Sequence, residues 1–134
     1  EGIAWAEFTA ADSNEVQSVV TKAVGECDAL YIPTDNTIAN NTEIVKNVAV
    51  PAGIPVVTGE EGMCSGCGLA TLSISYYDLG VKAAEMAYEI LTNGADPAQM
   101  AIGYVTDGIT EKYNADIAEA LNITIPEDMV AIEN

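Results

Sequence analysis

Cys64 and Cys67 are the most reactive pair of side chains that the sequence places close together. A C-x-x-C pair serves thiol–disulfide exchange when its first thiol lies at a helix N-terminus, and it supplies half of a structural zinc site. Glycines surround this pair and two acids precede it, and carboxylates nearby disfavour a thiolate. The remaining cysteine, Cys27, stands alone, so the second pair of a zinc ribbon is absent. We therefore predict either a local disulfide between Cys64 and Cys67 or two unreactive thiols, with a thiol–disulfide oxidoreductase as an alternative function.

The sequence contains neither histidine nor arginine among its 134 residues. Histidine is the commonest general base, so serine–histidine and cysteine–histidine catalysis within this chain are excluded. Arginine supplies the planar, bidentate contact to phosphate and carboxylate groups. A site in this chain must therefore use carboxylates, amides, hydroxyls or tyrosine rings. We expect no catalytic residue, no metal and no cofactor.

The chain carries 21 acidic and 4 basic residues, a formal net charge of −17. Such a surface repels phosphate backbones and anionic lipids, so we expect no nucleic-acid partner. No apolar run approaches the roughly 18 residues of a membrane-spanning helix. The first five residues resemble the interior of a domain rather than a secretory signal, and we expect a processed chain or a part of a longer protein.

Strand-like and helix-like segments alternate along the chain with short connections. We predict strands at residues 3–8, 29–32, 54–57 and 69–75, and helices at 12–24, 38–49 and 78–90, with Gly25 and Gly94 as C-terminal caps. The tail has short extended segments at 102–106 and 109–113, then a helix capped by Asn114, and its organised part ends at Pro126. Alternating strands and helices indicate an α/β fold with a parallel sheet covered by helices on both faces. The nearly all-apolar strands are expected to be buried on both faces.

Parallel α/β sheets bind ligands beyond the carboxyl ends of their strands. After the strand at 29–32, Thr34, Asp35 and Asn36 offer a hydroxyl, a carboxylate and an amide. The carboxylate of Asp35 suits a ligand ammonium group, but Asp35 or Asn36 could equally cap the following helix. Both interpretations remain open from the sequence.

Two further strand ends carry polar or aromatic side chains. Glu60 and Glu61 follow the strand at 54–57, and we expect one to face a ligand and the other to face solvent. Coordination of a hard cation there lacks further ligands. Ser75 ends the strand at 69–75 and Tyr76 follows it. A tyrosine ring can stack on a flat ligand, or it can pack in the core.

Four stretches of the sequence together resemble one family, and they cover nearly the whole chain in order. The stretches lie at residues 28–37 (DALYIPTDNT), 54–63 (IPVVTGEEGM), 69–80 (LATLSISYYDLG) and 120–126 (ALNITIP). They resemble the ABC-transporter substrate-binding proteins whose better-known members are assigned to tryptophan and other aromatic amino acids.

The resemblance implies a type I periplasmic-binding-protein fold, in which two Rossmann-like lobes trap a ligand between them. Residues 1–105 would form the second, C-terminal lobe without its opening strand, as a three-layer α/β/α unit with a mainly parallel sheet. Residues 106–134 would form the hinge crossover and a terminal helix that returns to the first lobe. The unpaired sheet edge of such a fragment would favour a homodimer.

The resemblance also implies a function without chemistry. The chain would be part of the solute-binding component of an ABC importer, presenting an amino acid, such as an aromatic one, to a permease. It would lie outside the cytoplasm, in the periplasm or as a bacterial cell-surface lipoprotein. A sensory ligand-binding domain of the same fold is an alternative.

The residues that would face the ligand belong to the three strand ends already described. They are Thr34, Asp35, Asn36, Glu60, Glu61, Ser75 and Tyr76. Two departures from the family pattern, the cysteines at 64 and 67 and a serine rather than asparagine at 75, leave the ligand's identity open.

Overall fold

The structure is a computed structural model that describes residues 2–106 and 108–133. It divides into two compact units. Unit 1 contains the residues up to Ser73 and those from Thr110 onward, and unit 2 contains Ile74–Ile109. We describe each unit by itself.

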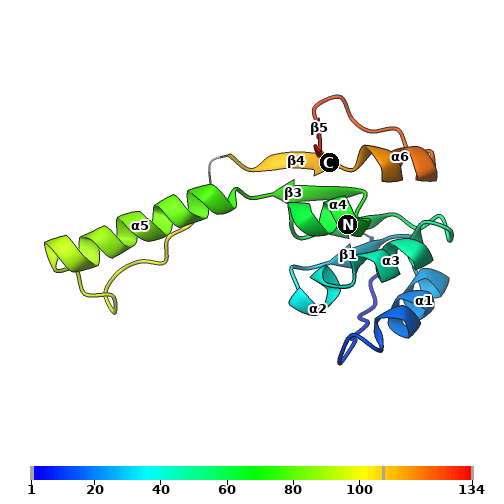
Figure 1. Cartoon of the computed structure of the whole chain (residues 1–134), viewed down its shortest axis with the longest axis horizontal. Helices are drawn as coiled ribbons and strands as arrows, with labels where there is room; N and C mark the ends of the chain where they lie inside the picture. Colours follow the sequence, from blue (N-terminus) through cyan, green and yellow to red (C-terminus); the bar gives the residue numbers. More distant parts are fainter. Residues whose placement is uncertain (1, 107, 134) are drawn as a thin grey trace. The chain divides into compact units, whose positions relative to one another are not determined.

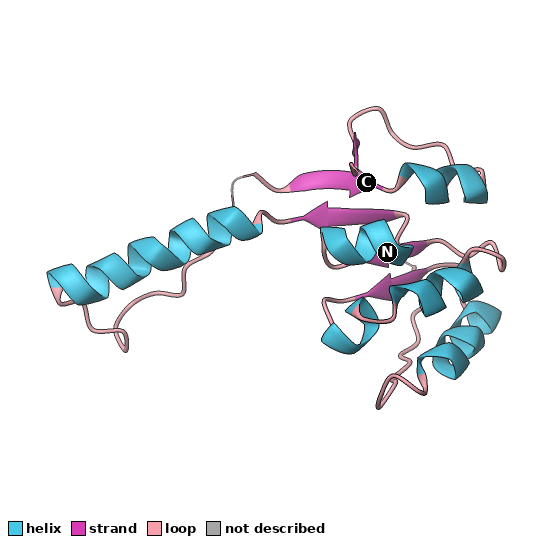
Figure 2. Cartoon of the chain, in the orientation of Figure 1, coloured by secondary structure: helices cyan, strands magenta, loops and turns pink. Residues whose placement is uncertain are grey.

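Unit 1 is built on a five-stranded sheet in the order β1-β2-β3-β4-β5 (Figure 2). The first three strands are parallel, β4 is antiparallel to β3, and β5 is parallel to β4. The strands are β1 Leu30–Ile32, β2 Val56–Thr58, β3 Ala70–Ser73, β4 Thr110–Tyr113 and β5 Val130–Ala131. The predicted α/β class with a mainly parallel sheet is confirmed. The organised part continues beyond Pro126, because β5 forms a sheet edge there.

In the described part of unit 1, helix α1 precedes β1 and four further helices lie between strands (Figure 1). These helices are α1 Val16–Glu26, α2 Asn36–Ala39, α3 Thr42–Ala49, α4 Glu61–Cys67 and α6 Ala115–Leu121. The single helix predicted at 38–49 is thus two helices, and α4 was not predicted. Gly25 lies inside α1 rather than at its end, and Cys27 takes the C-cap position with its N–H bonded to the carbonyl of Ala23.

The main core of unit 1 lies between one face of the sheet and helices α1, α3 and α4. Val16 and Val20 of α1 and Val45 of α3 are buried there against Val56 of β2 and Cys67 of α4. Side chains spaced three or four residues apart lie on one helical face, so the predicted apolar stripe of α1 packs into this core. Leu30 and Ile32 of β1 are half-buried against the same cluster.

The strands of unit 1 show alternating burial. Val56, Thr58 and Thr71 are buried, whereas Val57 and Leu72 between or beside them are exposed, and Tyr31 of β1 is 68% exposed. Successive side chains of a strand point to opposite faces, and the core described above covers one face. The expectation that the strand at 29–32 is buried on both faces is therefore wrong for Tyr31.

The segment at residues 3–8 is not a strand. The described sheet begins at β1, whose register joins it to β2, and both Ile3 and Trp5 are exposed. Extended residues form a strand only when a neighbour pairs with their backbone groups. The alternation of apolar residues at 3–8 was therefore a misleading signal.

Unit 2 consists of helix α5, Tyr76–Asn93, and the segment that follows it. Gly94 ends the helix in the left-handed conformation, at φ +70°, and its N–H bonds to the carbonyl of Glu89, as the sequence predicts. Residues 102–106, predicted as extended, belong to no strand, and Asp107 lies outside the described residues. In the part of the chain that the structure describes, no helix combines the length and apolar composition needed to cross a membrane.

Candidate functional site

The connections that follow β1 and β2 lie against each other in unit 1. The amide of Gly59 donates a hydrogen bond to the carbonyl of Ile32 at 2.9 Å. A Cβ added to Gly59 would come within 2.7 Å of the backbone nitrogen of Thr34 and 2.9 Å of its Oγ1. Only glycine permits so close an approach. The structure thus brings the predicted residues at 34–36 and 60–61 to one edge of the sheet.

Asp35 is the N-cap of helix α2. Its carboxylate accepts a hydrogen bond of 2.9 Å from the amide of Ile38, which satisfies one of the free N–H groups at the helix start. Thr34 and Asn36 on either side of it are exposed. Of the two interpretations that the sequence left open, the cap is therefore present for Asp35.

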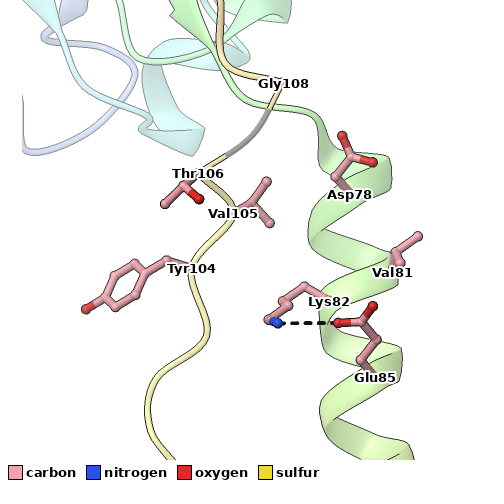
Figure 3. Close-up of a pocket in the computed structure, with 8 residues that line it drawn as sticks. All are labelled: Asp78, Val81, Lys82, Glu85, Tyr104, Val105, Thr106 and Gly108. Carbon is pink, nitrogen blue, oxygen red and sulfur yellow. Dashed lines mark hydrogen bonds and ion pairs between the residues drawn. The ribbon is translucent and has the colours of Figure 1, made fainter.

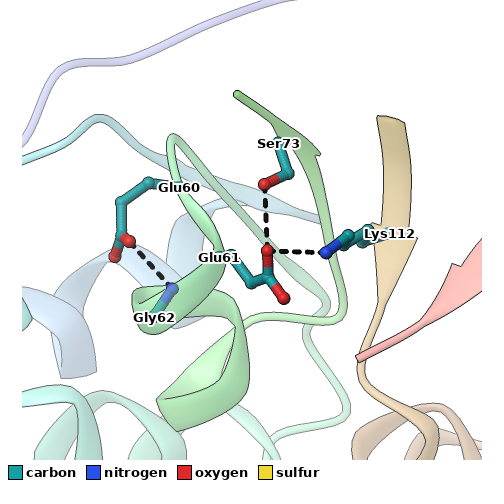
Figure 4. A network of polar contacts seen from close by, with 5 residues as sticks. All are labelled: Glu60, Glu61, Gly62, Ser73 and Lys112. Carbon is teal, nitrogen blue, oxygen red and sulfur yellow. Dashed lines mark hydrogen bonds and ion pairs between the residues drawn. The ribbon is translucent and has the colours of Figure 1, made fainter. Parts of the chain in front are cut away.

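Glu60 is the N-cap of helix α4. Its Oε2 accepts from the amide of Gly62 at 2.8 Å, and its Oε1 accepts from the amide of Met63 (Figure 4). The hydroxyl of Thr58 in turn donates to the Glu60 carbonyl at 3.1 Å. Both carboxylate oxygens of Glu60 are therefore engaged by the backbone of its own helix.

Glu61 has a different environment from its neighbour. Its Oε2 accepts a hydrogen bond of 2.7 Å from Lys112 Nζ and one of 3.2 Å from the hydroxyl of Ser73 (Figure 4). Lys112 lies on β4 and Ser73 ends β3, so three elements converge on one carboxylate. Oε1 takes neither of these two bonds. The Glu61 side chain is 40% exposed and that of Lys112 is 27% exposed.

The Lys112 hydrogen bond lowers the pKa of Glu61 below its ordinary value of 4.5. Partial burial opposes this effect, and the Ser73 hydroxyl and the positive charge of Lys112 add to it. A lowered pKa means that the ion pair stabilises the fold at neutral pH, and that this contribution is lost as the pH falls through the lowered value. Glu61 is thus held ionised by groups distant in sequence.

Sequence reasoning missed Lys112 and Ser73. Lys112 is 51 positions from Glu61, in a short strand of mixed composition, and the sequence contains no pattern that joins the two. The β3–β4 register pairs Thr71 with Lys112 and Ser73 with Thr110, and this antiparallel pairing brings Lys112 to α4. The one available signal was that Lys112 is one of only four lysines in a strongly acidic chain.

Ser75 and Tyr76 begin the helix of unit 2. The hydroxyl of Ser75 caps α5 by accepting from the amide of Asp78 at 3.1 Å, and Tyr76 is the exposed first residue of that helix. Farther along, unit 2 has a pocket of about 450 Å³ between α5 and residues 104–106 with Gly108 (Figure 3). Lys82 in its lining pairs with Glu85 at 3.3 Å. The lining does not include Ser75 or Tyr76.

Cys64 and Cys67 lie on α4 with their side chains buried, and both are free thiols, as is Cys27. Of the two alternatives left open by the sequence, a local disulfide or two unreactive thiols, the structure has free thiols. Burial raises the pKa of Cys64 to about 11 and that of Cys67 to about 12, and Glu60 adds to both shifts. Since the thiolate is the nucleophile, these thiols are poorly suited to disulfide exchange. Within the described residues no three acidic or cysteine side chains cluster as metal ligands would.

Comparison with known proteins identifies the family of the chain. Residues 1–133 match the family described as ABC transporter substrate binding protein. The chain belongs to this family of substrate-binding proteins. The resemblance drawn from the four sequence stretches is therefore confirmed.

Relatives of this substrate-binding protein include a tyrosine-binding protein of Clostridioides difficile strain R20291. It is 44% identical over 79 residues, which are 59% of this chain and 23% of the relative. An ABC domain from Streptococcus pneumonia, solved in complex with L-Trp, is 31% identical with a TM-score of 0.80. A conserved domain protein from Vibrio cholerae O1 biovar eltor is also 31% identical, with a TM-score of 0.84.

The chain spans less than half the length of these solved relatives. It covers 43% of the streptococcal chain and 45% of the Vibrio chain, while 93% and 98% of its own residues are matched. A ligand-free, open structure of a substrate-binding protein with adhesive properties from Clostridium difficile is likewise covered over less than half of its length. That match has a TM-score of 0.70, 35% identity and 42% coverage of the relative.

Proposed function

We propose that the chain forms part of the solute-binding component of an ABC import system and that its ligand is an aromatic amino acid. Membership of the substrate-binding family supports the general role. A tyrosine-binding relative and a relative solved with L-Trp support the ligand class. The observation that carries the proposal is Glu61, an ionised carboxylate with one oxygen fixed by two donors and the other outside those bonds.

In this proposal Glu61 Oε1 accepts a hydrogen bond from the ligand's α-ammonium group. A charge-assisted hydrogen bond of this kind is about twice as strong as a neutral one. Thr34 and Asn36, exposed at the same sheet edge, add a hydroxyl and an amide for the ligand's polar atoms. Asp35 and Glu60 act by capping α2 and α4, which fixes the loops that carry the other side chains.

Tyr76 and Ser75, at the start of α5 in unit 2, stay predicted ligand residues on the sequence argument alone, Tyr76 because its exposed ring can stack on a flat ligand. Stacking of two rings contributes about 0.5–1.5 kcal/mol beyond the area that it buries. Residues 1–105 would then be the second lobe of a two-lobed protein, and residues 106–134 would cross back to the first lobe. Ligand would be trapped in the cleft between lobes and presented to a permease outside the cytoplasm, without any catalytic step.

Calorimetry on the complete gene product that carries this sequence tests the proposal. The panel contains L-tyrosine, L-tryptophan, L-phenylalanine and, as an aliphatic comparison, L-leucine. We expect at least one aromatic amino acid to bind at least about tenfold more tightly than L-leucine, since the aliphatic side chain cannot stack on a ring. Absence of heat with all three aromatic amino acids would contradict the proposed ligand class.

Glu61→Gln tests the proposed contact to the ammonium group. The change keeps the shape of the side chain and removes its charge, so we expect affinity for the best amino acid to fall about tenfold to hundredfold. Glu119→Gln, an exposed acid on α6, is the matched control and should leave affinity unchanged. If the wild-type and Glu61→Gln proteins bind the amino acid with equal affinity, Glu61 does not contact the ligand's ammonium group.

A further inference from the structure

Lys112 is unusual among the four lysines of the chain. Lys22 lies on α1 with its ammonium 5.8 Å from the Phe8 ring centre, Lys46 lies on α3, and Lys82 pairs with Glu85 within α5. Within the part of the chain that the structure describes, Lys112 is the lysine that contacts a residue of the candidate site, Glu61, and it does so from a strand far away in sequence. In a chain with 21 acids, one of only four positive charges is thus placed at this carboxylate.

The position of Lys112 has an electrostatic consequence. An unpaired carboxylate in a strongly acidic protein attracts any cation, whether or not the cation carries a carboxylate of its own. The Glu61–Lys112 pair has no net charge, and its two members lie side by side, 2.7 Å apart, as a negative and a positive group. A zwitterionic ligand is attracted to both members, because its ammonium faces Glu61 while its carboxylate is favoured by Lys112. A simple amine gains only the first attraction and is repelled by the lysine.

Partial burial strengthens this effect. The Lys112 side chain is 27% exposed, so solvent screens its charge less than it screens a lysine on the open surface. The Ser73 hydroxyl donates to the same Glu61 oxygen, Oε2, so both of these bonds are made by one oxygen of the carboxylate (Figure 4). Two functions are thereby separated on one carboxylate, with Oε2 bound by the protein and Oε1 left for a ligand.

We propose that Lys112 is a positioning and specificity-determining residue, which orients Glu61 and makes the site select zwitterionic amino acids over amines that lack the α-carboxylate. The inference rests on the proposed function. It assigns the discrimination between amino acids and simple amines to a residue of this chain. The ligands described for the relatives do not specify such a discrimination.

Competition calorimetry with L-tyrosine and tyramine tests the inference, since the two ligands differ by the α-carboxylate alone. The quantity of interest is the ratio of the two affinities in the complete gene product. In Lys112→Met we expect the preference for L-tyrosine over tyramine to fall by about tenfold or more, from both weaker tyrosine and stronger tyramine binding. Lys112→Arg keeps the charge and should retain the preference. Lys46→Met, an exposed lysine on α3, should leave the ratio unchanged.

A second variant covers the case in which Lys112→Met does not fold because Glu61 is left without its partner. Glu61→Gln/Lys112→Met removes both charges, and its tyrosine-to-tyramine ratio is compared with that of Glu61→Gln alone. We expect the ratio to be lower in the double variant. An equal ratio in that comparison, or an equal loss of both ligands in Lys112→Met, overturns the inference while the proposed function stands. A wild-type protein that binds no aromatic amino acid overturns both.

Discussion

At the scale of single residues, two adjacent acids have taken different roles. Glu60 and Glu61 are chemically identical, yet Glu60 bonds to backbone amides of its own helix and Glu61 bonds to Lys112 and Ser73. The expectation that one acid faces a ligand and the other faces solvent needs revision for Glu60, whose carboxylate is used as a cap. The difference arises because adjacent residues at a helix start point in different directions.

The buried thiols of α4 give a prediction at the same scale. At pH 8 the pKa values of about 11 and 12 leave almost no thiolate at Cys64 or Cys67, and neither side chain is accessible. We expect iodoacetamide to label the half-buried Cys27 at least about a hundredfold faster than either, with the rate at Cys64 rising as the pH approaches 11. Mass spectrometry of peptides from native and guanidinium-unfolded protein measures the three rates.

A Cys27→Ser variant is the control for this experiment, because it should take up almost no label until it unfolds. Rapid labelling of Cys64 in the native protein at pH 8 would revive the oxidoreductase alternative. A mass 2 Da below that of the fully reduced protein would instead support the disulfide predicted from the sequence.

At the scale of secondary-structure elements, side-chain caps define where the helices begin. Asp35, Glu60, Ser75 and Asn114 each accept a hydrogen bond from a free N–H group in the first turn of the helix that follows. The first three are also predicted ligand residues, because polar residues after a strand suit both roles. Type and spacing alone could not separate the two roles.

Asn114 is the cap on which we expect the fold to depend most. Its side chain is buried, with the residue 3% exposed, and Oδ1 accepts from the amide of Ile117 at 3.2 Å. Its Nδ2 donates to the carbonyls of Cys64 at 3.2 Å and Ser65 at 2.9 Å, so it also joins α6 to the end of α4. We expect Asn114→Ala to lower the free energy of unfolding by about 2–4 kcal/mol.

Chemical denaturation followed by circular dichroism measures this loss. Asn47→Ala, an exposed asparagine of α3, is the matched control, and we expect it to change stability by no more than about 0.5 kcal/mol. A loss below about 1 kcal/mol for Asn114→Ala would mean that the contacts between α6 and α4 contribute little.

At the scale of the whole molecule, net charge is the dominant property. A formal charge of −17 on 134 residues produces mutual repulsion, and folding increases it by bringing the acids together. The two ion pairs in the described part of the chain, Lys82–Glu85 and Lys112–Glu61, offset little of this repulsion between acidic side chains. The acidity from which we expect no nucleic-acid partner therefore also lowers stability when salt is scarce.

Salt should accordingly stabilise the protein. The screening length shortens from about 30 Å at 0.01 M salt to about 8 Å at 0.15 M. We expect the melting temperature to rise by about 4 °C or more over this range, which corresponds to about 1 kcal/mol. Differential scanning calorimetry in sodium chloride and, as a control for ion-specific binding, in tetramethylammonium chloride measures the effect. An unchanged or lower melting temperature in both salts would contradict this account.

The sequence by itself determined the fold class, the family and the strand ends that carry the candidate site. Apolar strands, such as those predicted at 54–57 and 69–75, alternate with amphipathic helices, and this alternation indicates the fold class from the sequence alone. Helix α4 escaped prediction because Gly62, Gly66 and Gly68 resemble a loop, whereas in the structure the cap of Glu60 and the burial of Met63 hold that segment helical. In this segment tertiary packing outweighs the low helix propensity of glycine.

Only the tertiary structure decided which contacts each candidate residue makes. The antiparallel pairing of β3 with β4 brings Lys112 to Glu61 across 51 positions, and such a contact leaves no local pattern in the sequence. The types and spacing of residues specify which chemical groups are available at each strand end. They specify no more than this because hydrophobic periodicity and helix caps act over a few residues. Glu61 is paired with Lys112 and Ser73 only because contacts between elements far apart along the chain bring these residues together.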